Sequence, residues 1–233
     1  MNKDVIIACD FPSQQHLLDF LPRLGAARPY LKIGMELYYA AGPQLISSLK
    51  EQGYRIFLDL KLHDIPTTVK RAMSVLSALD IDMCNLHAGG GRPMMEAALE
   101  GLTRPDGSRP LLIAVTQLTS TDQQLLANDI LIDKPLDEVI LHYAANAKSA
   151  GLDGVVCSPL EAGIVHEHCG DGFLTVTPGV RFAEGDSNDQ KRIATPERAR
   201  EYGSDFIVVG RPITQADDPA AAYSRCCADF LGK

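Results

Sequence analysis

Short apolar runs alternate with amphipathic segments along almost the whole chain. Eight runs rich in Val, Ile and Leu have the length of buried strands: VIIACD, YLKIG, RIFLDLK, MCNLHA, LLIAVTQL, GVVCS, FLTVTPG and FIVVG. Helical spacing occurs between them over Pro43–Gln52, Pro66–Leu79, Arg92–Gly101, Pro135–Ala150 and Pro196–Tyr202. Strands that alternate with helices form parallel sheets, so the pattern predicts an α/β protein with a single closed (β/α)8 TIM barrel. An open doubly wound sheet is the alternative, although no strand is followed by a GxGxxG fingerprint.

The length of the chain agrees with this interpretation. A chain of 233 residues can bury the core of one barrel, and no linker or low-complexity tract divides residues 1–233, so we expect one catalytic domain. The longest polar stretch, RFAEGDSNDQKR at 181–192, follows the seventh predicted strand. Its content of Gly, Asp, Ser and Asn is typical of a mobile loop.

Charge and cysteine content limit the possible partners. The chain has 22 Lys and Arg against 30 Asp and Glu, a formal net charge of −8, and no basic run that could follow a nucleic-acid backbone. An anionic substrate would therefore need cations gathered locally at its site. The six cysteines include no CxxC pair, which favours reduced thiols in a cytoplasmic protein. No apolar segment has the length of about 18 residues that a membrane span requires.

Charged residues interrupt the predicted strands at one end of the barrel. In RIFLDLKL, successive residues point to opposite faces, so the aliphatic set faces the helices and Asp59 and Lys61 face the interior. Lys32 faces inward by the same alternation in YLKIG, and Asp10 ends the first run. All four lie toward the carboxyl ends of their strands, where barrel active sites are found.

These four charges have a structural and a functional interpretation. They could be ion pairs that hold the mouth of the barrel. However, burying an ion costs several kcal/mol, and pairing at best returns what desolvation took, so stability alone would favour Leu or Val at these positions. The clustering therefore favours a functional site.

Glycine and arginine follow the last two strands. VTPGVR supplies Pro178, Gly179 and Arg181, and VVGRPI supplies Gly210 and Arg211. In barrels the loops after strands seven and eight commonly bind phosphate, because glycine allows backbone N–H groups to approach and a cation completes the site. The pattern predicts a phosphorylated ligand.

Taken together, these motifs resemble the orotidine 5′-phosphate decarboxylase family in its short bacterial form. DLKLHDIPTTV is similar to the family signature DxKxxDIPxTV, with Thr67 where the signature usually has Asn. ACDF, LKIG, VTQLTS, TPGVR, DQKR and VGRPI accompany it in the family's order. The DxKxxD element is shared with related barrels, whereas the ordered set is specific.

The resemblance implies a role for each matching residue in converting orotidine 5′-phosphate to uridine 5′-phosphate and CO2, the last step of pyrimidine nucleotide biosynthesis. Lys61 would protonate C6 of the pyrimidine within a charge network of Lys32, Asp59, Lys61 and Asp64. The resemblance also implies a homodimer in which Asp64, Ile65 and Thr68 reach the neighbouring subunit's site. The remaining substrate-binding residues would be Asp10 and Lys32 at the ribose, Thr119 and Ser120 at the pyrimidine, Gln190 between base and phosphate, and Arg181, Gly210 and Arg211 at the phosphate. Pro178 would also be a substrate-binding residue.

No cofactor and no metal are expected. Related sugar-phosphate barrels that share DxKxxD, such as 3-keto-gulonate-phosphate decarboxylase and hexulose-phosphate synthase, carry a metal-binding Glu on the second strand. This chain has Lys32 there, and a cation would repel Mg²⁺. A second rival is a catalytically silent barrel that only binds phosphate, which would not need an inward Lys61.

Overall fold

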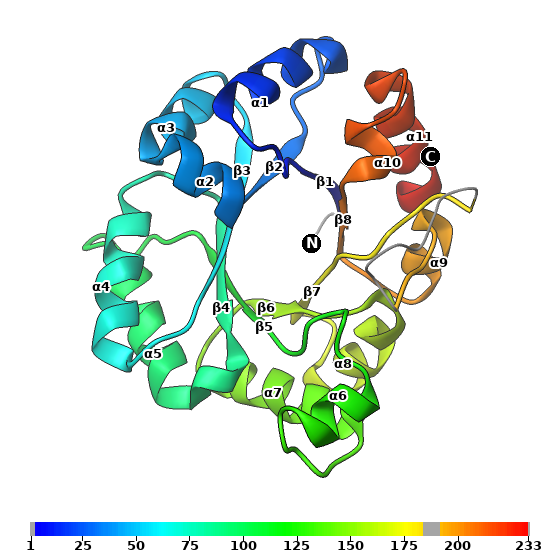
Figure 1. Cartoon of the computed structure of the whole chain (residues 1–233). Helices are drawn as coiled ribbons and strands as arrows, with labels where there is room; N and C mark the ends of the chain where they lie inside the picture. Colours follow the sequence, from blue (N-terminus) through cyan, green and yellow to red (C-terminus); the bar gives the residue numbers. More distant parts are fainter. Residues whose placement is uncertain (1–2, 184–191, 233) are drawn as a thin grey trace.

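The computed structural model describes residues 3–183 and 192–232. Eight parallel strands close into a barrel in chain order, and helices surround it (Figure 1). The strands are β1 Asp4–Ala8, β2 Tyr30–Gly34, β3 Arg55–Leu62, β4 Met83–His87, β5 Leu111–Val115, β6 Gly154–Val156, β7 Leu174–Thr177 and β8 Phe206–Val209. The barrel prediction is confirmed, and the open sheet is wrong because β1 pairs with β8.

Each expected helix is present, with ends that differ from the expectation by at most two residues. The helices are α1 Gln14–Phe20, α2 Met35–Ala41, α3 Pro43–Glu51, α4 Pro66–Ser77, α5 Gly91–Leu102, α6 Gln123–Asn128, α7 Leu136–Ser149, α8 Ala162–Cys169, α9 Pro196–Glu201, α10 Arg211–Thr214 and α11 Pro219–Leu231. Short 3-10 turns lie at Leu21–Leu24, Ala88–Gly90 and Pro159–Glu161. Proline within the first turn starts α3, α4 and α9, where its missing N–H costs no hydrogen bond.

The alternation of side chains divides the buried residues into two cores. The core inside the barrel contains Ile6, Ala8, Tyr30, Phe57, Met83, Ile113, Leu174, Val176, Phe206 and Val208. A larger core between strands and helices contains the other face of the same strands, including Ile56, Leu58 and Leu60 of β3. The predicted faces of β3 are therefore confirmed, and the inner apolar core ends below the level of Asp59.

Several strands are shorter than the apolar runs suggested. β1 ends at Ala8 rather than at Asp10, and β5 ends at Val115 although the run LLIAVTQL continues to Leu118. Hydrophobicity marks burial rather than ladder pairing, so it overestimates strand length at the barrel mouth. The residues beyond these strand ends are available to line the mouth.

The opposite, N-terminal face of the barrel is held by a repeated side-chain arrangement. An aspartate just before β4, β6 or β8 accepts a hydrogen bond from a backbone N–H of the preceding strand. The pairs are Asp82 with Ile56 N at 2.7 Å, Asp153 with Leu112 N at 2.7 Å, and Asp205 with Thr175 N at 2.9 Å. Lys50, Arg109 and His166 contact these three carboxylates in turn. These three aspartates each accept a hydrogen bond from a strand N–H group and therefore have a structural role.

Helices α4 and α5 pack unusually closely beside β3 and β4. At Gly101 of α5, a methyl group would lie 2.1 Å from the carbonyl oxygen of Lys70 in α4. Only glycine permits this approach, because the obstructing atoms belong to backbone rather than to a flexible side chain. The crossing fixes α4, which begins directly after the signature residues Asp64 and Ile65.

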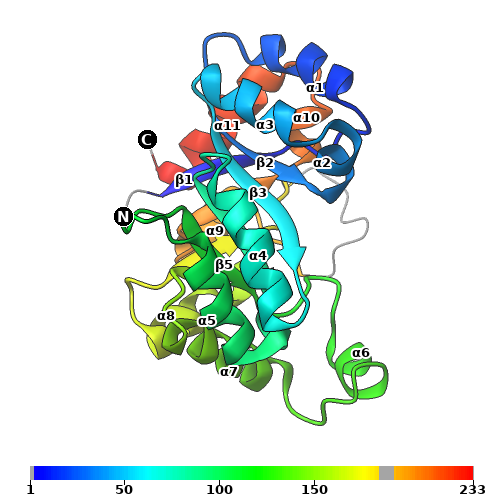
Figure 2. The same cartoon turned by 90° about the vertical axis from the view of Figure 1, so that its left-hand side faces the viewer.

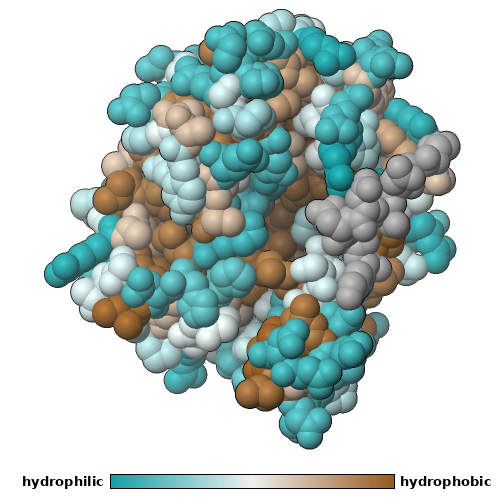
Figure 3. Space-filling model, in the orientation of Figure 1, coloured by the Kyte–Doolittle hydropathy of each residue, from teal (hydrophilic) through white to brown (hydrophobic). Residues whose placement is uncertain are grey.

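The strand ends open onto one side of the molecule. Helix α6 stands out on the side toward which β3 runs (Figure 2). The space-filling view shows a hollow at the barrel mouth and hydrophobic surface near α6 (Figure 3). Ile130 and Leu131, which follow α6 in the chain, are exposed. Within residues 3–183 and 192–232, no helix is long and apolar enough to cross a membrane. All six cysteines are free thiols, and five are buried.

Candidate active site

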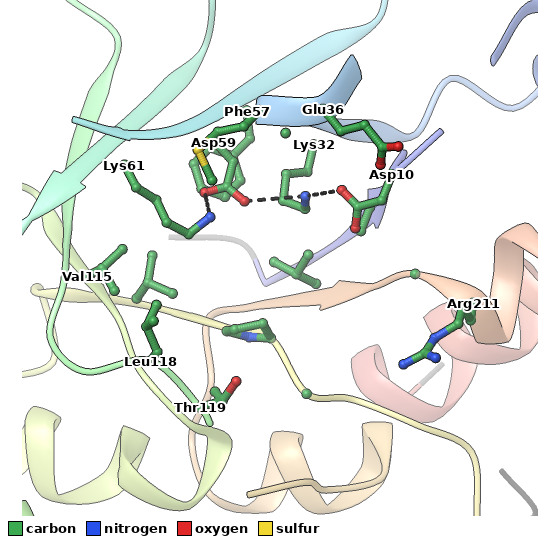
Figure 4. Close-up of a pocket in the computed structure, with 18 of the residues that line it drawn as sticks. Asp10, Lys32, Glu36, Phe57, Asp59, Lys61, Val115, Leu118, Thr119 and Arg211 are labelled. Carbon is green, nitrogen blue, oxygen red and sulfur yellow. Dashed lines mark hydrogen bonds and ion pairs between the residues drawn. The ribbon is translucent and has the colours of Figure 1, made fainter. Parts of the chain in front are cut away.

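A row of alternating charges crosses the barrel mouth. Lys61 Nζ lies 2.6 Å from Asp59 Oδ1, and Lys32 Nζ lies 3.3 Å from the other oxygen of Asp59. Lys32 Nζ also lies 2.7 Å from Asp10 Oδ1. Figure 4 shows Asp59 between the two ammonium groups, with Asp10 at the end of the row. The strands predicted to bring these four residues together do so.

The inner part of the row is buried. The side chains of Lys32 and Asp59 are each 10% exposed, whereas Lys61 is 25% exposed and Asp10 is 61% exposed. Burial opposes charge on both inner groups, yet Asp59 and Asp10 raise the pKa of Lys32 above its usual value. Against the same burial, Lys32 and then Lys61 lower the pKa of Asp59. Both inner groups therefore stay ionised at neutral pH.

Glycine at the end of β2 makes room for this row. A methyl group on Gly34 would lie 3.1 Å from Asp10 Oδ1 and 3.2 Å from Lys32 Nζ. These distances are tighter than ordinary contacts, so a side chain here would push the two charged groups. The local sequence KIG thus supplies both the cation and the space around it.

The charges line a cavity of about 740 Å³ that continues toward β7 and β8. That volume is within the range of pockets for small-molecule ligands. Gly210 and Arg211, at the start of α10, line this part of the cavity, and Arg181 after β7 also lines the cavity. Figure 4 shows Arg211 across the cavity from the row of alternating charges. One end of the cavity therefore combines acids and bases, and the other carries arginine beside glycine.

The remaining walls come from the loops after β5, β6 and β7. Thr119 and Ser120 line the cavity after β5, and Pro178 lines it after β7. Arg192 holds the neighbouring segment in place, because its guanidinium donates to the Leu118 carbonyl at 2.8 Å and forms an ion pair with Glu161. Gln190 lies outside the described residues.

Comparison with known proteins shows which family this chain belongs to. The family model described as "Orotidine 5'-phosphate decarboxylase / HUMPS family" matches residues 3–226. The chain belongs to this family.

Individual relatives within the family are similar over nearly the whole chain. A protein from Geobacillus sp. (strain WCH70) named "Orotidine 5'-phosphate decarboxylase" is 55% identical over 236 residues, which cover 100% of this chain and 99% of that one. A protein of the same name from Bacillus cereus (strain Q1) is 55% identical over 96% of this chain and 95% of its own length. The crystal structure of orotidine 5'-phosphate decarboxylase from Lactobacillus acidophilus is 45% identical, has a TM-score of 0.88 and is matched over 98% of this chain and 99% of that one. The resemblance derived from the motifs is confirmed.

Most residues that the orotidine 5′-phosphate decarboxylase signature selects lie together in the cavity. They are Asp10, Lys32, Asp59, Lys61, Thr119, Ser120, Pro178, Arg181, Gly210 and Arg211. Arg181 is buried, and its guanidinium also donates to the carbonyl of Val180 at 2.9 Å. One cavity therefore brings these residues of the chain together.

Three residues of the family signature lie outside the cavity of their own chain. Asp64, Ile65 and Thr68 are exposed around the start of α4 and do not line it. The Asp64 carboxylate accepts a hydrogen bond from the N–H of Ile65 at 2.6 Å, and the side chain of Ile65 is 66% exposed. Within this chain, the charge network therefore consists of Asp10, Lys32, Asp59 and Lys61, without Asp64.

Sequence reasoning did not identify a buried partner of the row of alternating charges. Asn85 on β4 is 1% exposed and donates from its amide nitrogen to Asp59 Oδ1 at 2.7 Å. The available signal was an amide within the apolar run MCNLHA, since a buried amide requires hydrogen-bond partners. Position in sequence did not show that its partner would be Asp59.

Proposed function

We propose that this chain releases CO2 from orotidine 5′-phosphate and forms uridine 5′-phosphate, with Lys61 as the proton donor to C6. The family and the relatives at 55% identity over the full chain support the reaction and its place in pyrimidine biosynthesis. The observation that carries the mechanism is the row of alternating charges that lines the cavity, buried at Lys32 and Asp59 and ending in Lys61.

The chemistry explains why the site needs a fixed ammonium group. Loss of CO2 leaves an electron pair in an sp² orbital at C6, where the ring π-system cannot delocalise it. A preorganised cation stabilises that developing charge and then supplies the proton, and such electrostatic stabilisation is usually the largest catalytic contribution. Asp59 accepts a hydrogen bond from Lys61 Nζ at 2.6 Å, which orients the ammonium group.

The rest of the cavity fits the rest of the substrate. Arg211 and Arg181, with the Gly210 backbone, form a cationic end for the phosphate, and Asp10 with Lys32 would hold the ribose hydroxyls. Thr119 and Ser120 would contact the pyrimidine, next to Pro178. Binding energy from the distant phosphate would position the ring against Lys61. Gln190 is proposed to join base and phosphate on the strength of the family motif alone.

The active form is proposed to be a homodimer. Asp64, Ile65 and Thr68 are exposed near the barrel mouth yet contribute nothing to their own cavity. Their position is suited to a second copy, whose cavity would receive them. The exposed Ile65 side chain supplies apolar surface that such a contact would cover.

The first experiment follows the near-ultraviolet absorbance of orotidine 5′-phosphate mixed with the purified protein. We expect a decrease as product forms, which Lys61→Ala abolishes. Lys70→Ala is the matched control, because Lys70 pairs with Glu100 on the outer helices. A flat trace from folded wild-type protein would contradict the reaction, and an active Lys61→Ala variant would contradict the role of Lys61.

Mixed dimers test the shared site. Asp64→Ala and Lys61→Ala are each expected to be inactive, and a hybrid dimer of the two regains one intact site. Random mixing makes half of the dimers hybrids, so about a quarter of the wild-type rate should return. No recovery after subunit exchange would show that Asp64 does not act across an interface.

A further inference from the structure

A buried amide links Lys61 and Asp59, two neighbours in the row of alternating charges. Asn85 lies on β4, beside β3, and is 1% exposed. Its side-chain oxygen accepts from the backbone N–H of Lys61 at 2.8 Å, and its nitrogen donates to Asp59 Oδ1 at 2.7 Å. Asn85 does not line the cavity, so it contacts the Lys61 backbone and the Asp59 carboxylate from the side away from the cavity.

The backbone that Asn85 holds is unusual. Lys61 has φ +51°, a left-handed conformation that costs energy for any residue other than glycine. The pairing of β3 with β4 also shifts register between Leu58 and Leu62, so the Lys61 N–H lies within an irregularity of the ladder. The Asn85 side chain replaces the missing backbone partner. Strained backbone of this kind persists only where its surroundings hold it.

The second hydrogen bond fixes the carboxylate. Asp59 Oδ1 receives both the Asn85 amide and Lys61 Nζ, the latter at 2.6 Å, while the other oxygen faces Lys32. The Asn85 amide thus fixes both the position of the Lys61 main chain and the orientation of the Asp59 carboxylate. Only a group that accepts on one side and donates on the other can do both.

We propose that Asn85 is a positioning residue that holds the Lys61 backbone and the Asp59 carboxylate in one arrangement, so that the Lys61 ammonium is aimed at the reacting carbon. This inference rests on the proposed role of Lys61 as proton donor. It assigns Asn85 no contact with substrate. Its loss should therefore reduce kcat much more than it raises KM, because Arg211, proposed to bind the phosphate, lies across the cavity, and Lys32 is the one proposed ribose contact that pairs with Asp59.

The sharpest variant is Asn85→Asp, which keeps the shape of the side chain. Its carboxylate still accepts from Lys61 N–H, but it faces Asp59 with a second negative charge. When the introduced carboxylate and Asp59 share a proton, the hydrogen bond that Asn85 donates to Asp59 is restored. When both carboxylates are ionised, they repel each other. The other charged or titratable groups nearby are Lys32, Lys61 and His87, whose ring lies 5.7 Å from that of His63. All of them are also present in the wild-type protein, so each pH is compared as the ratio of variant to wild type.

We expect kcat of Asn85→Asp at pH 8 to fall about 100-fold, the scale of a misplaced catalytic group, with KM within about threefold of wild type. The difference in kcat between Asn85→Asp and wild type should become smaller as pH is lowered toward 5. Asn85→Ser, whose smaller side chain leaves space for water, provides a second variant and should lose about tenfold in kcat. Ser77→Ala is the control, because it removes a buried hydrogen bond to the Leu102 carbonyl far from the cavity and should leave kcat unchanged.

Two results would overturn the inference. One is a kcat within about threefold of wild type for both Asn85 variants at pH 8. The other is a kcat deficit of Asn85→Asp that stays constant with pH, since that would indicate general damage rather than repulsion of Asp59. Lys61→Ala in the same assay separates the two proposals: if it is fully active, the role of Lys61 fails, and if it is inactive while both Asn85 variants are active, only the positioning role fails.

Discussion

The close crossing of α4 and α5 makes a stability prediction that opposes ordinary helix propensity. Alanine normally stabilises a helix relative to glycine by about 1 kcal/mol. At Gly101, however, the added methyl group would lie 2.1 Å from the Lys70 carbonyl oxygen, against an ordinary contact of 3.4 Å. The helices would have to separate locally by about 1.3 Å, and overpacking of this type costs about 1–3 kcal/mol.

We therefore expect Gly101→Ala to lower the free energy of unfolding by about 1–2 kcal/mol. The urea midpoint should fall by about 0.5 M, with the slope of the transition unchanged. Gly163→Ala is the matched control, because that glycine is also helical and its added methyl group would lie 3.5 Å from the Tyr202 carbonyl oxygen. This control should gain about 0.5–1 kcal/mol. If Gly101→Ala were as stable as Gly163→Ala, the argument from backbone approach would be refuted.

Three further predictions concern the charge row. Gly34→Ala should raise KM about tenfold by displacing Lys32 and Asp10 from their present contact, and unchanged steady-state kinetics would contradict this. Although burial opposes it, Lys32 and then Lys61 lower the pKa of Asp59, so its ionisation contributes stability above about pH 4 that is lost as pH falls through the lowered pKa. Below about pH 4, the urea midpoint of wild type should therefore fall relative to that of Asp59→Asn. A difference between the two midpoints that stays constant with pH would disprove this linkage. EDTA should leave turnover intact because the Lys32 ammonium occupies the space between two carboxylates, whereas activity that returns only with Mg²⁺ would refute metal independence.

The site could be predicted from the sequence wherever local periodicity sets direction. Asp59, Lys61 and Lys32 face the barrel mouth because a strand alternates its side chains, and the apolar neighbours of each residue show which face meets the helices. Arg211 could be placed near them because the strands of a barrel end at one face. Periodicity failed for the ends of strands, since Asp10 lies past the end of β1 and still lines the cavity.

Contacts between strands that are not periodic required the tertiary structure. Asn85 and Lys61 are 24 residues apart, and their hydrogen bond depends on the register shift between β3 and β4. Nothing in RIFLDLKL indicates that Lys61 takes a positive φ, because lysine has no preference for that conformation. For Asp64, the family resemblance already implies a place at a neighbouring subunit's site, and the structure adds that this residue does not line the cavity of its own chain.

The sequence by itself determined the barrel, the charged mouth and the family, because alternation and motif order are local properties of the chain. The tertiary structure decided the order of charges from Lys61 to Asp10, the ionisation of Asp59 and Lys32, and the link through Asn85. The ion-pair distances of 2.6 to 3.3 Å determine which charged groups interact, and their desolvation determines how strong each interaction is. Both quantities arise only when distant strands are packed against one another.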